Sequence, residues 1–327
     1  DTYKNDLYHF ALVLAKADRS VSKLEKATLN ILYTELSEPL VQTETAVSPL
    51  IFPANSKQPL EEILGELDIL TGLDNVKQKV TEWVNAVQGQ QDDIHGQHRK
   101  RTLLDLCHMV FTGNPGTGKT TVARIISKLY RALGVLSSGH LVKVNGTELV
   151  AEDTVGTTAK VNQVVDLALG GMLFVEGPYP LVSEGGTASG KAAIATLLKR
   201  LDTDRDRMAV VFAGSHEELQ IFLGADPKLQ AQVNNWLHFE DYTVDELMEI
   251  FMLRCLRLNY QLNDGALKKL HAILARNAQH SDHVLGNGRF VNKLFEQILE
   301  HHAKRIAGCG GLTKEMLTTI VAEDILG

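Results

Sequence analysis

The spacing of apolar residues predicts helices at the start of the chain. Leu7, Phe10 and Leu14 recur with a helical period, and a second apolar run follows a capping-box pattern. We therefore expect a small helical segment over residues 1–37. Residues 38–59 contain four prolines among several serines and threonines, a composition typical of a linker.

From residue 60 to residue 240, short apolar runs alternate with amphipathic stretches. Residues 60–88 predict two helices, and the polar residues 89–101 predict a loop. Apolar runs predict strands over residues 107–111, 141–144, 172–175 and 208–213. Strands that alternate with helices indicate an α/β domain with a parallel sheet and right-handed crossovers. The pattern over residues 241–327 is helical throughout, which predicts a separate helical lid.

Composition and charge limit the classes of function. The 327 residues are 44% hydrophobic and 22% charged, which is ordinary for a globular protein. The net charge of −7 leaves no surplus of Lys and Arg to bind phosphates nonspecifically, so we expect no nucleic acid partner. The three cysteines have neither disulfide nor metal-ligand spacing, and no apolar stretch is long enough to span a membrane. These features favour a soluble, cytoplasmic protein.

The strongest chemical signal is a phosphate-binding loop between an apolar run and a helix. Residues 113–120 satisfy G-x-x-x-x-G-K-[ST] in full, and a helical stretch over residues 121–133 follows. The glycines let backbone N–H groups surround phosphate oxygens. Lys119 is expected to reach the β- and γ-phosphates, and Thr120 is expected to ligate Mg²⁺. We therefore expect ATP or ADP, with Mg²⁺, to bind through Gly113, Asn114, Pro115, Gly116, Thr117, Gly118, Lys119, Thr120 and Thr121.

A second glycine-rich segment nearly repeats this motif. Residues 185–192 end in Ala192, which lacks the hydroxyl group that magnesium requires, and they follow a polar stretch instead of a strand. We expect this segment to be a flexible loop that enters a helix over residues 193–201.

Several longer runs resemble one family. LTGLDNVKQKV, HMVFTGNPGTGKTTVARIISKLYRALGVL, VNNWLHFEDYTVDELMEIF and GNGRFVNKLFEQ are similar to CbxX/CfxQ-type AAA+ ATPases, which include Rubisco-activase-like, sporulation and type VII secretion members. The resemblance implies an AAA+ α/β domain, a helical lid, and assembly with other AAA+ subunits as a homo- or hetero-oligomer, with hexameric rings expected. It also implies that Arg289 contacts nucleotide as the sensor 2 arginine, and that the segment from Ile69 to Leu73 lies beside the adenine. The start of the chain resembles TerB-like domains over some thirty residues.

The chain departs from this family at the Walker B strand. The family has four apolar residues followed by Asp-Glu, whereas here residues 172–175 are followed by Glu176 and Gly177. In this register Glu176 takes the magnesium position, and Gly177 cannot polarise the attacking water. In a register shifted by one, Glu176 is the catalytic base and Val175 replaces the metal carboxylate. Either register lacks one acid.

Two further motifs differ from those of the family. Where relatives carry two arginines, one of which is the arginine finger for the neighbouring site, this chain has Gln230 and Gln232, with Lys228 as the nearby cation. A neutral amide cannot stabilise charge on the γ-phosphate, and an arginine finger contributes roughly a thousandfold or more in rate. Residues 151–156, where relatives carry an aromatic that grips a threaded peptide, hold two acids and no aromatic.

These departures favour one of two functions. The first is an ATP-binding AAA+ subunit with weak or absent hydrolysis, which serves as a structural or regulatory member of a ring or larger assembly. The alternative is an active AAA+ ATPase that remodels a protein client and uses Glu176 and Lys228 in place of the missing groups. We favour the first, and neither identifies the protein client. The lid histidines, which we expect to be solvated instead of metal-bound, are His280, His283, His301 and His302.

Overall fold

The computed structural model describes residues 49–54, 58–88, 107–182, 187–233, 235–279, 286–307 and 313–326. Contacts divide the chain into residues 1–46 and 47–327, and every described residue belongs to the second unit. The helical segment expected over residues 1–37 and the loop expected over residues 89–101 lie outside the described residues.

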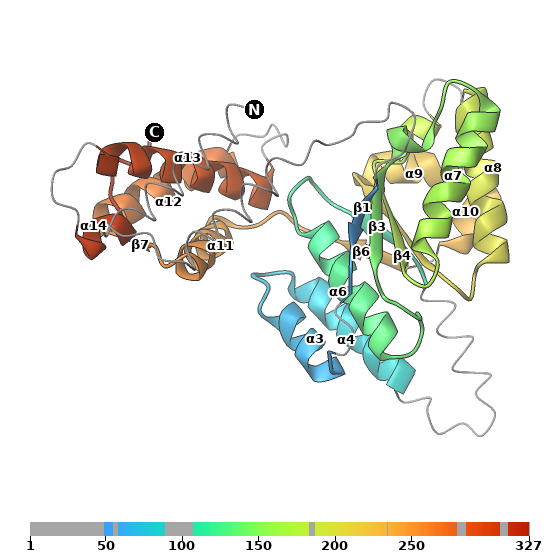
Figure 1. Ribbon diagram of the computed structural model, residues 1–327, viewed down its shortest axis with the longest axis horizontal. Helices are drawn as coiled ribbons and strands as arrows, with labels where there is room; N and C mark the ends of the chain where they lie inside the picture. The colour runs from blue at the N-terminus through green and yellow to red at the C-terminus, as the bar shows by residue number, and fades with distance from the viewer. Residues whose placement is uncertain are drawn as a thin grey trace, which may run out of the picture. The chain divides into compact units, whose positions relative to one another are not determined.

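A six-stranded sheet organises the first part of the described chain (Figure 1). Its strands stand in the order β1 (Leu50–Phe52), β3 (Leu141–Asn145), β4 (Met172–Glu176), β5 (Ala209–Gly214), β2 (His108–Thr112) and β6 (Asn235–His238). All neighbouring strands are parallel except β1 and β3. The predicted α/β fold is confirmed. The pattern of apolar runs missed β1 and β6.

The linker expected over residues 38–59 is wrong near its end, where three residues form β1. Phe52 packs against the core, and the guanidinium carbon of Arg124 lies 4.6 Å from the centroid of its ring. The prolines on either side flank the strand without interrupting it, which an edge strand tolerates. The sequence pattern did not predict this strand, because three apolar residues are too few to show an alternating pattern.

Helices cover both faces of the sheet, because alternate residues of each strand point to opposite sides. Met109 and Phe111 of β2 belong to one core, and Val110 belongs to the other. Figure 1 shows α6 on one side of the sheet, with α7 and α8 on the other. The first core includes residues of α3 (Leu60–Asp68), α4 (Asp74–Gln88) and α6 (Lys119–Ala132). The second includes residues of α7 (Thr154–Ala168), α8 (Ala188–Thr203), α9 (His216–Gly224) and α10 (Pro227–Gln232), and of the short turns η1 (Gly146–Leu149) and η2 (Tyr179–Leu181).

The second glycine-rich segment starts a helix instead of forming a loop up to residue 192. Thr187 is the N-cap of α8, and its side chain accepts a hydrogen bond from the Gly190 backbone N–H. A Cβ at Gly190 would lie 2.2 Å from the carbonyl oxygen of Leu181. Gly190 therefore permits close packing of α8, and the expected loop is wrong from residue 188 onward because the cap lies earlier than the apolar period suggests.

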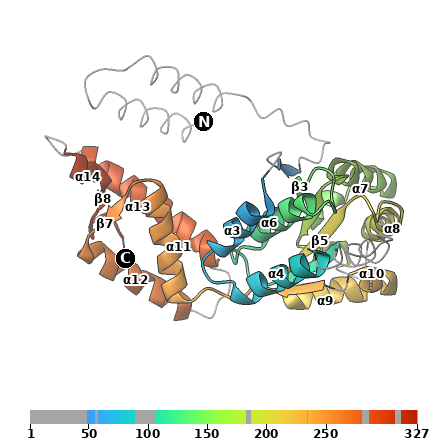
Figure 2. The same cartoon turned by 90° about the horizontal axis from the view of Figure 1, so that it is seen from below.

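The C-terminal part is a lid with its own core. Figure 2 shows α11 (Val244–Arg257), α12 (Asp264–Gln279), α13 (Asn287–Ala307) and α14 (Lys314–Thr318) gathered around two short strands. These strands, β7 (Gln261–Leu262) and β8 (Thr319–Ile320), pair in parallel. The predicted helical lid is confirmed. The sequence did not predict these two strands, because a strand of two residues shows no alternation of apolar and polar positions. None of the described helices is long and apolar enough to cross a membrane.

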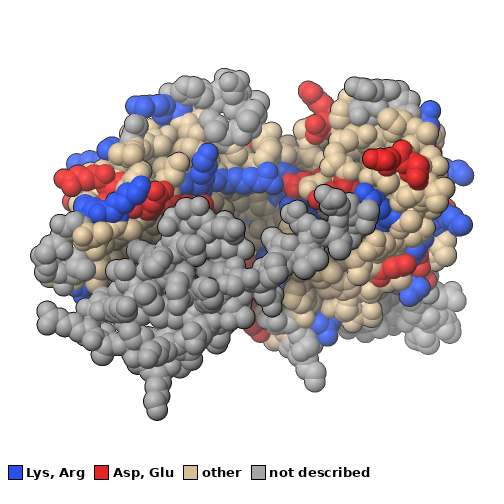
Figure 3. Space-filling view, turned by 45° about the horizontal axis from the view of Figure 1, so that its top comes forward, with Lys and Arg blue, Asp and Glu red and all other residues tan. Residues whose placement is uncertain are grey.

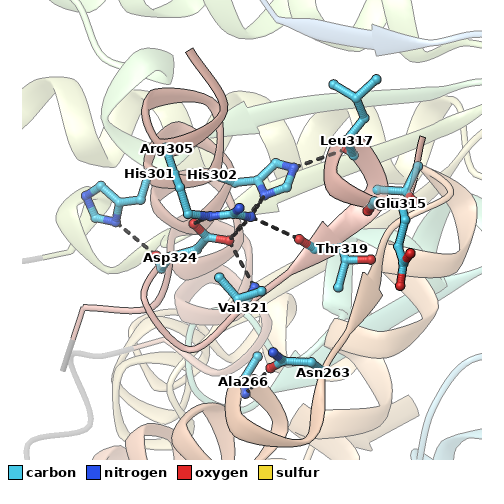
Figure 4. Close-up of polar contacts among 11 residues, drawn as sticks. Asn263, Ala266, His301, His302, Arg305, Glu315, Leu317, Thr319, Val321 and Asp324 are labelled. Atoms are coloured by element: carbon cyan, nitrogen blue, oxygen red, sulfur yellow. Dashed lines mark hydrogen bonds and ion pairs between the residues drawn. The ribbon is translucent and has the colours of Figure 1, made fainter. Parts of the chain in front are cut away.

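A buried polar cluster joins the last described residues to α13 (Figure 4). Asp324 accepts a hydrogen bond from Arg305 Nε at 2.7 Å, and His302 Nδ1 lies 3.2 Å from Asp324 Oδ2. His302 is buried, so the expectation of solvated lid histidines is wrong at this position, whereas His280 and His283 lie outside the described residues. Among the side chains that the structure describes, no group of three or more His, Cys, Asp or Glu is arranged to hold a metal ion.

Candidate functional site

Residues 113–118 form a tight loop between β2 and α6. Gly113, Gly116 and Gly118 have φ angles of 141°, 83° and 94°, which residues with side chains rarely adopt. At Gly113 a Cβ would also lie 2.3 Å from the carbonyl oxygen of Phe239. The backbone therefore requires the glycines of the motif. The loop leads directly into the N-terminus of α6, where backbone N–H groups and the helix dipole favour an anion.

Lys119 begins α6, and its ammonium group lies within the loop. Its Nζ donates to the carbonyl oxygens of Gly113 at 2.7 Å and Asn114 at 2.6 Å. Burial lowers the pKa of Lys119 to about 8, and the charge of Glu176 opposes that change. A phosphate in the loop would give this ammonium group the opposite charge that it needs, so Lys119 is suited to hold one.

The start of α13 contacts the loop. The Gly288 backbone N–H donates to the carbonyl oxygen of Gly116 at 3.0 Å. The Asp241 carboxylate accepts from Asn114 Nδ2 at 2.8 Å and from Asn287 Nδ2 at 2.7 Å. Asp241 and Asn287 thus connect the loop to the lid. Neither side chain belongs to a motif that predicts this contact from sequence, although Asn287 lies in the GNGRF run that carries the resemblance.

Glu176 ends β4 and lies between two cations. Lys143 Nζ is 2.5 Å from Glu176 Oε2, and Arg289 Nη2 is 2.9 Å from Oε1. Burial raises the pKa of Glu176, but the hydrogen bonds and charges of Lys143 and Arg289 outweigh burial and hold the pKa below its ordinary value. Glu176 is therefore ionised.

On the face that Figure 3 shows, basic and acidic side chains also lie next to one another in several places.

Several of these residues line one cleft of about 630 Å³. Its polar lining includes Lys119, Thr120, Thr121, Glu176 and Arg289, and its apolar lining includes Ile69, Leu70, Leu73, Ile250, Leu253 and Leu258. The structure thus brings together the phosphate loop, the segment expected beside adenine, and Arg289, the residue that the resemblance implies is sensor 2. A cleft with cationic and apolar walls is complementary to a nucleotide, which has anionic phosphates and a flat base.

Thr120 and Glu176 are the residues predicted to ligate magnesium, and both line the cleft. Hydroxyl and carboxylate oxygens match the ligands that Mg²⁺ takes in proteins. The surrounding charge does not match, because each carboxylate oxygen of Glu176 already contacts a cation, Lys143 or Arg289. A magnesium ion would have to displace one of these cations to reach the carboxylate.

Gly177 takes the position expected of the water-polarising carboxylate in the first of the two registers, in which Glu176 takes the magnesium position. Its φ is 60°, and nothing lies within 4 Å of the place that a Cβ would take. Its backbone N–H donates to the carbonyl oxygen of Ala213 at 2.7 Å, which holds it beside β5. The position therefore has room for a side chain but a backbone conformation that favours glycine.

The segment in which the resemblance implies arginines forms α10 and does not contribute to the cleft. Gln232 Nε2 donates to Asp202, and Gln230 lines a different pocket beside Trp236. The structure therefore does not bring this segment to the phosphate loop of the same chain. In the segment expected to face a client, Val155 is 77% exposed at the start of α7.

Two family descriptions match the chain. Residues 109–225 match the ATPase family associated with various cellular activities (AAA), and residues 243–326 match the AAA lid domain. The chain also has the fold of the FIGL-1 AAA domain solved in complex with ADP, with a TM-score of 0.51, 14% identity and 86% of each chain covered. At that identity, the likeness shows the fold alone.

Curated relatives match most of this chain. Stage V sporulation protein K of Bacillus subtilis (strain 168) is 35% identical over 272 residues, which cover 81% of this chain and 82% of that protein. The chloroplastic ribulose bisphosphate carboxylase/oxygenase activase of Cyanidioschyzon merolae is 34% identical over 271 residues, which cover 82% and 91%. The ESX-3 secretion system protein EccA3 of Mycobacterium tuberculosis is 33% identical over 303 residues, which cover 86% of this chain and 48% of that protein. The chain therefore spans about half the length of EccA3.

Proposed function

This chain belongs to the CbxX/CfxQ-type AAA+ ATPase family, and on that basis we propose that it binds ATP or ADP in the cleft of about 630 Å³. In this proposal the phosphates lie in the loop over residues 113–121, and the base lies beside Leu73. Arg289 approaches the phosphates from the lid, and Thr120 and Glu176 are the side chains that offer oxygen ligands to Mg²⁺. The observation that carries the proposal is that the loop, Arg289 and an apolar wall line the same cleft.

The second part of the proposal is that this site hydrolyses ATP weakly or not at all. Attack on the γ-phosphate requires a group that orients the water and charge that stabilises the transition state, and an arginine finger alone contributes roughly a thousandfold or more. Gly177 supplies no such group. Gln230 and Gln232 carry no charge to offer a neighbouring subunit. A site with these residues keeps the phosphate loop that binds nucleotide. It lacks the group that orients the attacking water and the arginine finger, both of which serve cleavage.

The third part of the proposal concerns assembly. Members of the AAA+ family usually form oligomeric rings. We assign this chain a structural or regulatory role in a homo- or hetero-oligomer of AAA+ subunits, with a hexameric ring as the expected form. We assign the α/β domain to residues 60–240, together with β1 at the edge of its sheet, and the lid to residues 241–327. The relatives' names refer to sporulation, Rubisco activation and secretion, so they do not converge on one client.

Phosphate release in excess ATP tests the proposed loss of hydrolysis. The parent chain is expected to bind ATP in a titration and to release phosphate no faster than its Lys119→Ala variant. Release by the parent on the order of 1 s⁻¹ or more, which is ordinary for enzymes, would overturn this part of the proposal. That result would favour the active remodelling ATPase, in which Glu176 and Lys228 replace the missing groups.

A fourfold variant tests the cause of the loss. It combines Glu176→Asp, Gly177→Glu, Gln230→Arg and Gln232→Arg, and it is expected to raise phosphate release at least roughly tenfold once it assembles, because base and finger act on one transition state. A side chain at Gly177 costs about 1–2 kcal/mol of folding free energy, because the backbone there lies in the left-handed region. The matched control therefore carries the other three substitutions and keeps this glycine. If the fourfold variant forms rings and binds ATP but releases no phosphate, loss of side chains is not the cause.

A further inference from the structure

One face of α11 forms the lid side of the cleft. Four residues of this helix line the cleft, namely Ile250, Leu253, Arg254 and Arg257. They stand at positions i, i+3, i+4 and i+7, so their side chains share one stripe of an α-helix. The stripe combines two apolar side chains with two guanidinium groups. It therefore offers the cleft both a surface for a flat ring and positive charge.

The two arginines of this stripe are held differently. The Arg254 guanidinium carbon lies 4.9 Å from the centroid of the Phe295 ring, and Arg254 also contacts Asn292 and Glu296. Arg257 is exposed, and within the described parts of the chain no hydrogen bond or ion pair holds its side chain. A ligand can therefore engage Arg257 without breaking a contact to any of the described residues.

The α/β domain supplies an apolar wall of the same cleft. This wall includes Ile69 and Leu73, and a Cβ at Gly118 of the phosphate loop would lie 3.4 Å from Leu73 Cδ1. Ile69 is 66% exposed, and Leu258, which lines the cleft at the end of α11, is 51% exposed. Exposed apolar side chains on both the α/β domain and the lid are suited to cover a base that lies between them.

The surroundings of Arg257 in the cleft suit a base better than a phosphate. Leu253 precedes it by one turn and Leu258 follows it, and both line the cleft. Other cations lie at the phosphate loop. Lys119 Nζ donates to carbonyl oxygens of the loop, and the Arg289 backbone nitrogen would lie 2.9 Å from a Cβ at Gly116. The charge of Arg257 is therefore available to another part of the nucleotide.

We propose that Arg257 contacts the base of the bound nucleotide and stacks its guanidinium plane on the ring. This inference rests on the proposed nucleotide site and makes affinity depend on the base as well as on the phosphates. A guanidinium group is planar and weakly hydrated, so it stacks on flat π systems in a way that an ammonium group does not. A cation over the face of a ring is also attracted electrostatically, and more strongly where water is excluded.

Titration calorimetry with ATP and with ribose 5-triphosphate, which lacks only the base, tests the inference. Arg257→Met is expected to weaken ATP binding roughly three- to tenfold and ribose 5-triphosphate binding by less than about twofold. Arg257→Lys keeps the charge and loses the planar group, so it is expected to restore little of the affinity for ATP. Lys268→Met removes a charge from an exposed site on α12, outside the cleft, and is the matched control.

Two results would overturn the inference. The first is an equal loss of ATP and ribose 5-triphosphate binding in Arg257→Met, which would mean that Arg257 acts through charge alone. The second is a parent chain that binds the two ligands with equal affinity, and this measurement needs no variant to fold. In both cases the phosphate site stands. A parent chain that binds neither ligand refutes the proposed nucleotide site itself.

Urea unfolding of the variants separates a base contact from a role in the helix. Arg257 lies in the last turn of α11, where a cation interacts favourably with the helix dipole. If that is its whole role, Arg257→Met is less stable, Arg257→Lys is as stable as the parent, and both bind ATP like the parent. Loss of ATP affinity in a lysine variant of unchanged stability supports the base contact instead.

Discussion

Acid is expected to destabilise the α/β domain through His108, the first residue of the strand that leads into the phosphate loop. His108 is 2% exposed and pairs in register with Val210. Burial, followed by the charge of Arg205, lowers the pKa of His108 from 6.5 to about 4, against a smaller opposing effect of the Cys107 backbone. The folded domain therefore holds this imidazole neutral at a pH where the unfolded chain protonates it.

The sign and size of the effect follow from the two pKa values. Between pH 6.5 and pH 4 the unfolded chain binds more protons than the folded chain, so stability is lost as the pH falls through this window. The full difference corresponds to about 3 kcal/mol, and the loss between pH 7.5 and pH 5 is about 2 kcal/mol. That is a large share of the stability of an ordinary domain.

Urea unfolding at pH 7.5 and pH 5, followed by tryptophan fluorescence, measures this loss. Both tryptophans of the chain, Trp83 and Trp236, lie in the α/β domain, so the signal reports that domain and not the lid. The matched variant is His108→Met, which keeps an apolar stem in the strand and cannot titrate. The parent should lose about 2 kcal/mol more than the variant between the two pH values. If both proteins lose the same free energy, His108 is not the group responsible.

The remaining predictions concern the nucleotide and the lid. Lys119→Ala should weaken ATP binding at least roughly tenfold in a titration, through loss of one charge-assisted contact, and unchanged affinity would refute the site. A nucleotide-bound structure should show the Arg289 guanidinium near the β- or γ-phosphate, and an Arg289 that points into solvent with the lid on nucleotide would contradict its assignment. Arg305→Met should destabilise the lid by about 3 kcal/mol or more in urea unfolding followed by circular dichroism, because it leaves the buried Asp324 carboxylate with less compensation. Lys304→Met, at an exposed ion pair, is the control and should cost less than about 1 kcal/mol, and equal losses would contradict the argument.

The amino-acid sequence determined the features that depend on neighbouring residues. The phosphate loop is one continuous run, and its glycines are required by local φ angles, so residues 113–120 could be predicted to form it. Four strands could be predicted because each contains a mostly apolar run of four to six residues between helical stretches. The identities of Gly177, Gln230 and Gln232 were also plain from sequence, since a missing acid or arginine is a matter of residue type.

Tertiary structure alone decided the features that join distant residues. Lys143 meets Glu176 because β3 and β4 are neighbours in the sheet, and no local pattern encodes the order of parallel strands. Asp241 connects Asn114 to Asn287 because the lid packs on the loop, across 127 and 46 residues of chain. Hydrophobic periodicity reports which face of an element is buried and not which element covers it. The phosphate loop can therefore be predicted from the sequence. The cations that contact Glu176 come from the sheet and the lid, so only the packing of these two parts places them there.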